Sequence, residues 1–371
     1  MKITEIAPFL LHVPVTGGGI SDSTHEITHW GMPGCRIITD TGLEGFGYTG
    51  THAAASLDRL ITSCISDVYA PLLLNEDPRE VRFLHSKLLF DPPSHWVGRG
   101  GITQMALSAV DIALWDLKAK AIGEPLWHLL GGSAGKSVEA YNTDCGWLNL
   151  SSEKLVDGCR YMIEEEGFAA VKMKVGKPDP KEDLERVEAV RSAIGSKARL
   201  MVDANAKWNL PMAIQYGSRF AEFDVTWFEE PLWHDDVSGH ASLAKAIDTP
   251  IALGESLYNR DQFREFVTAE GVHYLQPDAS RCGGITGLWE IADLGLAHNI
   301  PVSPHHGDMM QAQLHAVIAH SGCDQLEFIP WTLHCFEEPI CVKDGRYRVP
   351  EQPGAGTTIT PDSFEKYGIS L

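Results

Sequence analysis

The chain from about residue 136 onward alternates between strand-like and helix-like segments, and this alternation limits the possible folds most strongly. Short apolar runs recur there with helical stretches between them. The runs that we expect to form strands are 138–144, 169–175, 199–204, 225–230, 249–255, 272–278, 300–305 and 324–329. Eight strands separated by helices are typical of a parallel α/β barrel. A doubly wound open sheet is the competing architecture, but no glycine-rich phosphate loop comes after the first strand.

The first 130 residues have a different pattern, which indicates a second domain. Residues 1–50 alternate like antiparallel strands around the turn signal DTGLEG. Residues 53–130 have helical periodicity, and Gly123 and Pro125 should end the clearest helix. The tail 341–371 returns to strand and turn character and should pair with the N-terminal sheet. We predict an N-terminal α+β domain over 1–130, a barrel over 136–330 and a C-terminal segment over 331–371 that returns to the first domain.

The overall charge and the apolar pattern exclude several classes of partner. A net charge of −20 argues against binding to nucleic acid or to an anionic membrane surface, because both need a basic face. The N-terminal stretch MKITEIAPFLLHVPV is a poor signal peptide, and no window approaches 18 uninterrupted apolar residues. The eight cysteines form no CxxC pair, which suits reduced thiols. We therefore expect a cytoplasmic protein with a small-molecule partner.

Three acidic residues lie at the ends of three of the predicted strands, at equal intervals. Asp203 in VDAN, Glu229 in FEEP and Glu255 in GES are each 26 residues apart. In a parallel barrel, the carboxyl ends of the strands build the active site, so the three carboxylates should meet there. One acid alone would more often cap a helix or lie in a solvated loop. Three together predict a site for a divalent metal, and carboxylate oxygens suit Mg²⁺.

The strand 169–175 carries Lys172 and Lys174, two positions apart and therefore on one face. In a barrel that face points inward, where two ammonium groups are costly without a function. We expect their mutual repulsion and partial burial to lower both pKa values, which would make a lysine a usable base. The alternative is an edge strand with two solvated lysines.

The sixth and seventh strands should end beside a carboxylate and a histidine. Asp278 lies at the end of the sixth strand and His305 at the end of the seventh. An aspartate on a neighbouring strand can hold the imidazole in one tautomer and raise its basicity. His306, the next residue, is a weaker candidate for the same role.

These motifs together resemble the enolase superfamily, specifically the mandelate racemase group (the mandelate racemase/muconate lactonizing enzyme family), over nearly the whole chain. The matching features are the helix 106–132, the Lys-x-Lys pair, VDAN, FEEP, GES, PDASRCGG, VSPH and Glu327 in LEF. The resemblance implies an α/β fold, a modified TIM barrel (β/α)7β with an N-terminal α+β capping domain. It also implies one Mg²⁺ bound by Asp203, Glu229 and Glu255, with Asn205 as a polar neighbour. Glu230 is the weaker acid of FEEP. Members of this group are often homo-oligomers.

The resemblance also implies roles for the remaining residues. Lys174 is expected to be the base on one face of the substrate, and Lys172 should contact the substrate carboxylate. His305, oriented by Asp278, should be the acid or base on the opposite face. Glu327 matches a residue that hydrogen-bonds the carboxylate as it becomes an enediolate.

Two opposed bases permit β-elimination, racemisation or epimerisation, so the reaction depends on the substrate. The loop 16–31 is rich in Ser, Thr, Asp and His, and in this family it would close over the substrate. The residues expected to contact the substrate are Asn205, His25, His29, Trp30, Tyr48 and His52, with Thr49 and Arg99 as further polar candidates. A polar lid suits a sugar acid better than an aromatic acid.

We therefore favour a dehydratase that converts a sugar acid or related hydroxy acid to a 2-keto-3-deoxy acid. Lys174 would remove the α proton and His305 would protonate the departing hydroxyl, or the two roles would be reversed. The alternative is a racemase, an epimerase or a lactone cycloisomerase that uses the same residues. A non-catalytic sugar-acid binder is a third hypothesis, which the complete set of acids and bases disfavours.

Overall fold

The computed structural model describes residues 1–305 and 310–371, and parallel strands form a barrel at its centre. The strands are β6 (Val138–Asn142), β7 (Ala170–Lys174), β8 (Arg199–Asp203), β9 (Val225–Glu229), β10 (Ile251–Leu253), β11 (Tyr274–Leu275) and β12 (Gln325–Phe328). Strands β6 to β11 pair in chain order, and β12 pairs with β6. Val302 closes the ring, because it forms parallel bridges to Leu275 on one side and Cys323 on the other.

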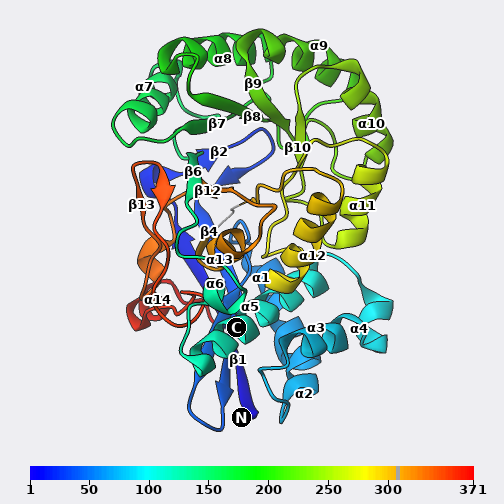
Figure 1. Cartoon of the computed structure of the whole chain (residues 1–371), viewed down its shortest axis with the longest axis vertical. Coiled ribbons are helices and arrows are strands. Elements are labelled where there is room, and N and C mark those ends of the chain that lie inside the picture. Colours follow the sequence, from blue (N-terminus) through cyan, green and yellow to red (C-terminus); the bar gives the residue numbers. More distant parts are fainter. Residues whose placement is uncertain (306–309) are drawn as a thin grey trace.

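Seven helices connect these strand positions and surround the barrel (Figure 1). They are α7 (Ser152–Glu164), α8 (Pro180–Ile194), α9 (Leu210–Phe220), α10 (Val237–Ala246), α11 (Arg260–Thr268), α12 (Gly284–Ala297) and α13 (Met310–Ala319). This count refers to the part of the chain that the structure describes. The arrangement confirms the predicted (β/α)7β barrel.

The sixth and seventh strands are shorter than the sequence indicated. β11 has two residues, and the seventh strand is the single bridge at Val302. Pro277, Pro301 and Pro304 surround these positions, and proline has no N–H to donate to a ladder. The residues that follow these two strand positions still lie at the carboxyl end of the barrel, where Asp278 and His305 line a cavity.

The inward-facing side chains of the barrel form two layers of opposite character. The lower layer is a cluster of Tyr141, Ala170, Met201, Trp227 and Ala252. Two residues further along three of the strands, the same face carries Lys172, Asp203 and Glu229. Residues two positions apart on a strand point to the same face, so the apolar floor and the charged layer above it both lie inside the barrel.

The N-terminal domain is an antiparallel sheet covered by helices, as predicted. The sheet has the order β1 (Ile3–Pro14), β4 (His29–Thr39), β5 (Glu44–Tyr48). The helical elements are α1 (Ala55–Ser63), the π-helical turn η2 (Cys64–Tyr69), α2 (Ala70–Leu73), α3 (Val81–Leu89), α4 (Pro92–Val97), α5 (Ile102–Ile122) and α6 (Leu126–Leu129). Gly47 lets β5 approach α5 closely, since a Cβ there would lie 2.0 Å from the carbonyl oxygen of Ala109. Gly123 ends α5 in the left-handed region with φ 78°.

A short hairpin extends from the N-terminal domain to the barrel. It consists of β2 (Ile20–Ser21) and β3 (Glu26–Ile27). The backbone N–H of Leu148, in the loop after β6, donates to the carbonyl of Ser21 at 2.8 Å. The hydroxyl of Ser23 donates to the carbonyl of Ala204, just beyond β8, at 2.7 Å. The hairpin tip therefore lies at the carboxyl end of the barrel strands, where a lid is expected.

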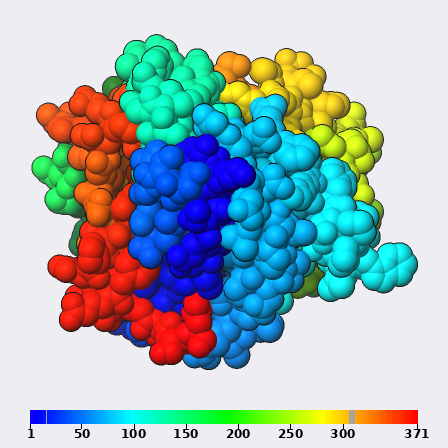
Figure 2. Space-filling view, turned by 90° about the horizontal axis from the view of Figure 1, so that it is seen from below, coloured from blue at the N-terminus to red at the C-terminus, as the bar shows by residue number. Residues whose placement is uncertain are grey.

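The C-terminal segment contacts both parts of the molecule. It contains β13 (Val342–Lys343), β14 (Arg346–Tyr347) and α14 (Pro361–Tyr367). β14 pairs with the barrel strand β6, whereas the N–H of Ile369 donates to Leu10 in β1 at 2.9 Å. Figure 2 shows this segment in red beside the dark blue N-terminal strand. The expected pairing with the N-terminal sheet thus accounts for only the last residues, and the domain boundaries stay a prediction.

Two further features concern the cysteines and the helices. All eight cysteines have free thiols. Within residues 1–305 and 310–371, no helix has the length and apolar character needed to cross a membrane.

We predict that Asp116→Ala destabilises the fold. The buried Asp116 carboxylate in α5 accepts hydrogen bonds from the N–H groups of Ala355 at 2.7 Å and Phe46 at 3.0 Å, and it pairs with Lys120 at 2.6 Å. Removing one partner of a buried ion pair costs about 3–5 kcal/mol. Thermal and urea unfolding should show this loss. The control Asp157→Ala removes the exposed ion pair between Asp157 and Arg160 and should change the free energy of unfolding by less than about 1 kcal/mol. Equal unfolding midpoints in the two variants would contradict the prediction.

Candidate active site

Three carboxylates meet at the carboxyl end of the barrel. Asp203 ends β8, Glu229 ends β9, and Glu255 lies two residues beyond β10. Each offers an oxygen atom, and the three atoms lie within 4.8 Å of one another. Asp203 and Glu229 are fully buried, and Glu255 is partly buried.

The charges of this cluster explain why it suits a divalent cation. Burial raises the pKa of Glu229 to about 7, although Lys172 opposes the shift. Burial together with the charges of Glu255 and Asp203 raises the pKa of Glu230 well above its ordinary value. A divalent cation relieves this repulsion, and three carboxylate oxygens are a ligand set that Mg²⁺ accepts.

The two lysines of β7 point into the same cluster, as the sequence predicted. Lys172 Nζ lies 2.5 Å from Glu229 Oε1 and 2.9 Å from Glu327 Oε1. Lys174 Nζ lies 2.5 Å from Asp203 Oδ2.

The expected lowering of the lysine pKa values is not found. Burial does lower them, but the neighbouring carboxylates outweigh burial and raise the pKa of both Lys172 and Lys174. The sequence argument counted the repulsion between the two ammonium groups and omitted the acids that face them. Mg²⁺ bound by Asp203 and Glu229 would weaken the attraction that favours protonation of both lysines.

Glu327, in β12, is held by contacts from several elements. Besides Lys172, the hydroxyl of Thr143 donates to its carboxylate, and the phenol of Tyr347 in β14 donates to its backbone carbonyl. The C-terminal segment therefore helps to position a residue of the charged layer. The expected contact of Glu327 with a substrate carboxylate stays a prediction.

His305 and Asp278 form the predicted pair. His305 Nδ1 lies 2.8 Å from Asp278 Oδ2, and the other oxygen of Asp278 accepts from the N–H of Ser280 at 2.7 Å. His305 Nε2 lies 3.1 Å from Glu255 Oε2. Burial lowers the pKa of His305, but Glu255 and Asp278 outweigh burial and raise it to about 9. His306 lies outside the described residues.

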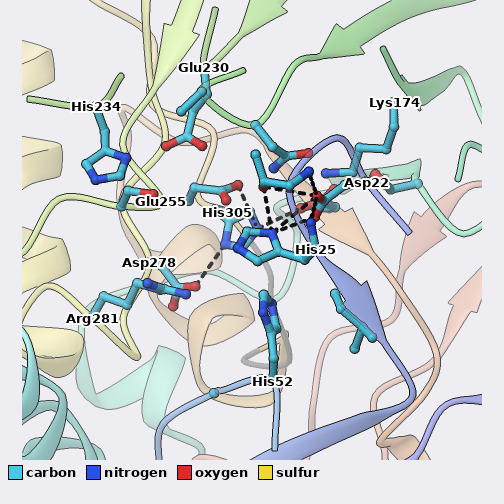
Figure 3. A pocket seen from close by; sticks show the side chains of 18 of the residues that line it. Asp22, His25, His52, Lys174, Glu230, His234, Glu255, Asp278, Arg281 and His305 are labelled. Carbon is cyan, nitrogen blue, oxygen red and sulfur yellow. Dashed lines mark hydrogen bonds and ion pairs between the residues drawn. The ribbon is translucent and has the colours of Figure 1, made fainter. Parts of the chain in front are cut away.

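Lys174 and His305 both line one cavity of about 290 Å³. They come from the second and seventh of eight strand positions, so they approach the cavity from different sides. In Figure 3, Lys174 and Asp22 lie on one side, and His234 and Arg281 lie on the other. Four of the residues predicted to contact the substrate line this cavity: His25, Trp30, His52 and Asn205.

The structure does not bring the other predicted contacts to this cavity. Tyr48 is fully buried and packs against Phe336 with ring centroids 5.5 Å apart. His29 has an exposed side chain that lines a different surface depression. Thr49 donates to the carbonyl of Ser280, and Arg99 is exposed. His29 precedes Trp30 in β4, and successive side chains of a strand point to opposite faces, so only one of the two reaches the cavity.

The sequence analysis did not predict several residues that line the cavity. They are Asp22, Trp147, Trp233, His234 and Arg281. Asp22 lies in the lid loop and Arg281 in the PDASRCGG string, so both had a local signal. Trp147 lies in the loop after β6, and its ring is 5.3 Å from Lys174 Nζ. No spacing in the sequence indicated that contact.

The backbone just beyond the predicted metal ligands Asp203 and Glu229 has an uncommon conformation. Asn205, Ala206 and Glu230 have φ values of 43°, 59° and 39°. The N–H of Asn205 donates to Asp203 Oδ1 at 2.9 Å, and its own Oδ1 has no hydrogen-bond partner among the described residues. Such conformations in non-glycine residues are costly and persist where the surrounding structure holds them. Here they fix Asp203 and turn Asn205 toward the cavity.

Comparisons with known proteins identify the family. A family model for the mandelate racemase/muconate lactonizing enzyme N-terminal domain matches residues 31–131, and an enolase C-terminal domain-like model matches residues 154–363. The L-talarate/galactarate dehydratase of Salmonella typhimurium is 37% identical over 325 residues, which are 88% of this chain and 79% of the relative. The chain belongs to the mandelate racemase/muconate lactonizing enzyme family.

Two other relatives extend the comparison. The 3,6-anhydro-alpha-L-galactonate cycloisomerase of Streptomyces coelicolor is 33% identical over 365 residues, which are 94% of each chain. The structure of L-talarate dehydratase from a Polaromonas species, complexed with Mg and L-glucarate, superposes with a TM-score of 0.90 at 34% identity and covers 100% of this chain and 98% of that chain. Asp203, Glu229 and Glu255 are positioned for the same cofactor, Mg²⁺.

We predict that Mg²⁺ stabilises this family member through Asp203. A ligand at 100 times its dissociation constant stabilises the folded state by about 2.7 kcal/mol. Adding Mg²⁺ should raise the unfolding midpoint of the parent protein, and Asp203→Asn should remove most of that increase. The control Asp261→Asn changes an exposed acid of α11 and should keep it. A full Mg²⁺ response in Asp203→Asn would contradict the proposed ligand set.

Proposed function

We propose that the protein is a Mg²⁺-dependent dehydratase that converts a sugar acid to a 2-keto-3-deoxy acid. The main support is a single cavity in which Lys174 and His305 approach from different sides beside the carboxylate cluster. The relatives named for dehydration of talarate and galactarate point to a sugar diacid as substrate. The polar lid around His25 agrees with a polyhydroxylated ligand.

The residues of the cavity can perform the steps of this reaction. A proton α to a carboxylate is weakly acidic, so its removal requires stabilisation of the developing enediolate. When bound, Mg²⁺ supplies positive charge against that developing negative charge. Lys172 adds a second positive charge beside Glu327, and Lys174 is the base at the α carbon. His305, held by Asp278, is the acid or base on the other face.

An isomerase is the second candidate, because the same residues can return a proton to the enediolate. The cycloisomerase relative matches 94% of the chain, a larger share than the dehydratase relative. Elimination and isomerisation share the first proton transfer, and they differ in whether the enediolate then loses a hydroxyl group or regains a proton.

We also propose a class of partner and a cellular location for this protein. The acidic net charge of −20 favours a small-molecule partner over nucleic acid or an anionic membrane. The free thiols favour the cytoplasm as location. Homo-oligomerisation stays a prediction from the family resemblance.

We predict that Lys174→Ala and His305→Asn each abolish turnover while the fold is kept. General acid–base groups contribute about 10²–10⁴-fold to the reaction rate. In this proposal Lys174 and His305 are each the only acid–base group on their face of the substrate. Steady-state kinetics on the identified substrate should show the loss, with circular dichroism as the control for folding. Turnover near the parent level in both variants would refute the assignment of bases.

A screen of sugar acids in D₂O should identify both substrate and reaction. With Mg²⁺ present, a dehydratase yields keto acid, whereas an epimerase exchanges the α proton without keto acid. Chelation should remove activity and added Mg²⁺ should restore it. If activity persists in metal-free protein, the metal-dependent mechanism is wrong.

A further inference from the structure

Arg281 is a cation of the active-site cavity that has no acidic partner. Its side chain lines the cavity, and within residues 1–305 and 310–371 its guanidinium group forms no ion pair and no hydrogen bond. The other cavity side chains that carry or can carry a positive charge beside an acid are paired: Lys174 with Asp203, His25 with Asp22, and His305 with Asp278. The guanidinium of Arg281 is therefore available to an anionic group of a ligand.

Asp278, three residues before Arg281, does not occupy the guanidinium. Its Oδ2 lies 2.8 Å from His305 Nδ1, and its Oδ1 accepts a hydrogen bond from the N–H of Ser280 at 2.7 Å. Burial raises the pKa of Asp278, but the hydrogen bond from His305 and the charges of His305 and Arg281 outweigh burial and lower it. Arg281 therefore lies near the aspartate–histidine pair without forming a bond to it.

The backbone around Arg281 is anchored from both domains. The N–H groups of Arg281 and Cys282 both donate to the carbonyl of Asp278 at 2.9 Å, which forms a turn after the sixth strand position. The carbonyl of Ser280 accepts a hydrogen bond from the buried hydroxyl of Thr49 at 2.6 Å, so the N-terminal domain holds the same turn. A binding group on an anchored backbone loses less conformational freedom when a ligand binds.

The histidines near Arg281 are uncharged, so the guanidinium is the cation that this side of the cavity offers. In Figure 3, Arg281 and His234 lie across the cavity from Lys174. Burial lowers the pKa of His234, and it lowers the pKa of His52 to about 4; the charge of Arg281 adds to both shifts. Both rings can form hydrogen bonds with hydroxyl groups near neutral pH, but only Arg281 can neutralise a carboxylate there.

A sugar diacid brings two negative charges into this cavity. In the proposed function, Mg²⁺ and Lys172 stabilise the carboxylate at the reacting end as it becomes an enediolate. The second carboxylate also needs a counterion, because a charge that loses water without gaining a partner is strongly unfavourable. Arg281 is unpaired among the described residues, and a guanidinium can donate two parallel hydrogen bonds to one carboxylate. A sugar monoacid has no second charge for Arg281 to bind.

We propose that Arg281 binds the second carboxylate of the substrate and so makes the enzyme select sugar diacids over sugar monoacids. This inference rests on the proposed dehydratase function. Arg281 determines which substrate binds, and the proton transfers stay with Lys174 and His305.

The test compares two ligands that differ only at the end that does not react. One is a sugar diacid that the Mg²⁺-loaded parent protein dehydrates, and the other is the matching aldonate, in which a hydroxymethyl group replaces the second carboxylate. The KM of the diacid and the inhibition constant of the aldonate are measured in each variant. Arg281→Met removes the charge, Arg281→Lys keeps it, and the control Arg264→Met changes an exposed arginine of α11 that does not line the cavity.

In Arg281→Met we expect the KM of the diacid to rise by about 10- to 100-fold, the range for loss of a hydrogen bond to a charged group. The inhibition constant of the aldonate and the kcat for the diacid should stay near their parent values. Arg281→Lys should lie between the parent and Arg281→Met, because a lysine keeps the charge without the paired donors. Arg264→Met should match the parent.

Other outcomes overturn the inference. If Arg281→Met lowers kcat and leaves KM unchanged, Arg281 acts through Asp278 and His305 and does not select the substrate. Equal increases in the KM of the diacid and the inhibition constant of the aldonate would mean that the variant has lost general binding. A parent protein that dehydrates aldonates but no diacid also refutes the role of Arg281, and the dehydratase function survives. A parent protein that dehydrates no sugar acid refutes the proposed function itself.

Discussion

The balance of buried charges inside the barrel is the constraint on which the site depends. Two ammonium groups and three carboxylates, those of Asp203, Glu229 and Glu327, occupy the layer above the apolar floor with almost no exposure to solvent. A charge without a partner there costs several kcal/mol, so each must be paired. Lys172 lies between Glu229 and Glu327, and Lys174 lies against Asp203. Each of these groups is thus held in place by the others. They meet because alternate residues of every barrel strand point inward.

This balance links the metal to the bases. The acids that pair with the lysines include the expected ligands of Mg²⁺, so cation binding and lysine protonation depend on the same carboxylates. Asp203 is central, because its oxygens meet both lysines and the N–H of Asn205. The strained turn at Asn205 and Ala206 prevents this carboxylate from turning away. The site is thus organised before a ligand arrives, which is the condition for electrostatic stabilisation of an enediolate.

The sequence predicted those parts of the site that depend on period and spacing. Residues at strand ends, such as Asp203 and Glu229, were predictable because the barrel brings all carboxyl ends to one face. Lys172 and Lys174 were predictable as an inward pair, but their pKa values were not, because these depend on carboxylates contributed by other strands. Tyr48 was wrongly expected at the cavity for a similar reason: it belongs to a sheet whose buried face meets the C-terminal segment at Phe336. Trp147 and Trp233 come from loops, and the conformation of a loop produces no periodic pattern in the sequence.

The lid adds a negative charge beside a base of the barrel. Burial would raise the pKa of Asp22, but the hydrogen bond from His25 and the charge of Lys174 lower it, so the lid carboxylate stays ionised beside the base of the barrel. Lys174 therefore has one acidic partner from the metal cluster and electrostatic support from one on the lid. Mg²⁺ bound by Asp203 would weaken the attraction between Asp203 and Lys174, and the attraction of Asp22 for Lys174 would then contribute relatively more. Metal binding and the lid would then both affect the protonation of Lys174, because Asp203 and Asp22 each place negative charge near its Nζ atom.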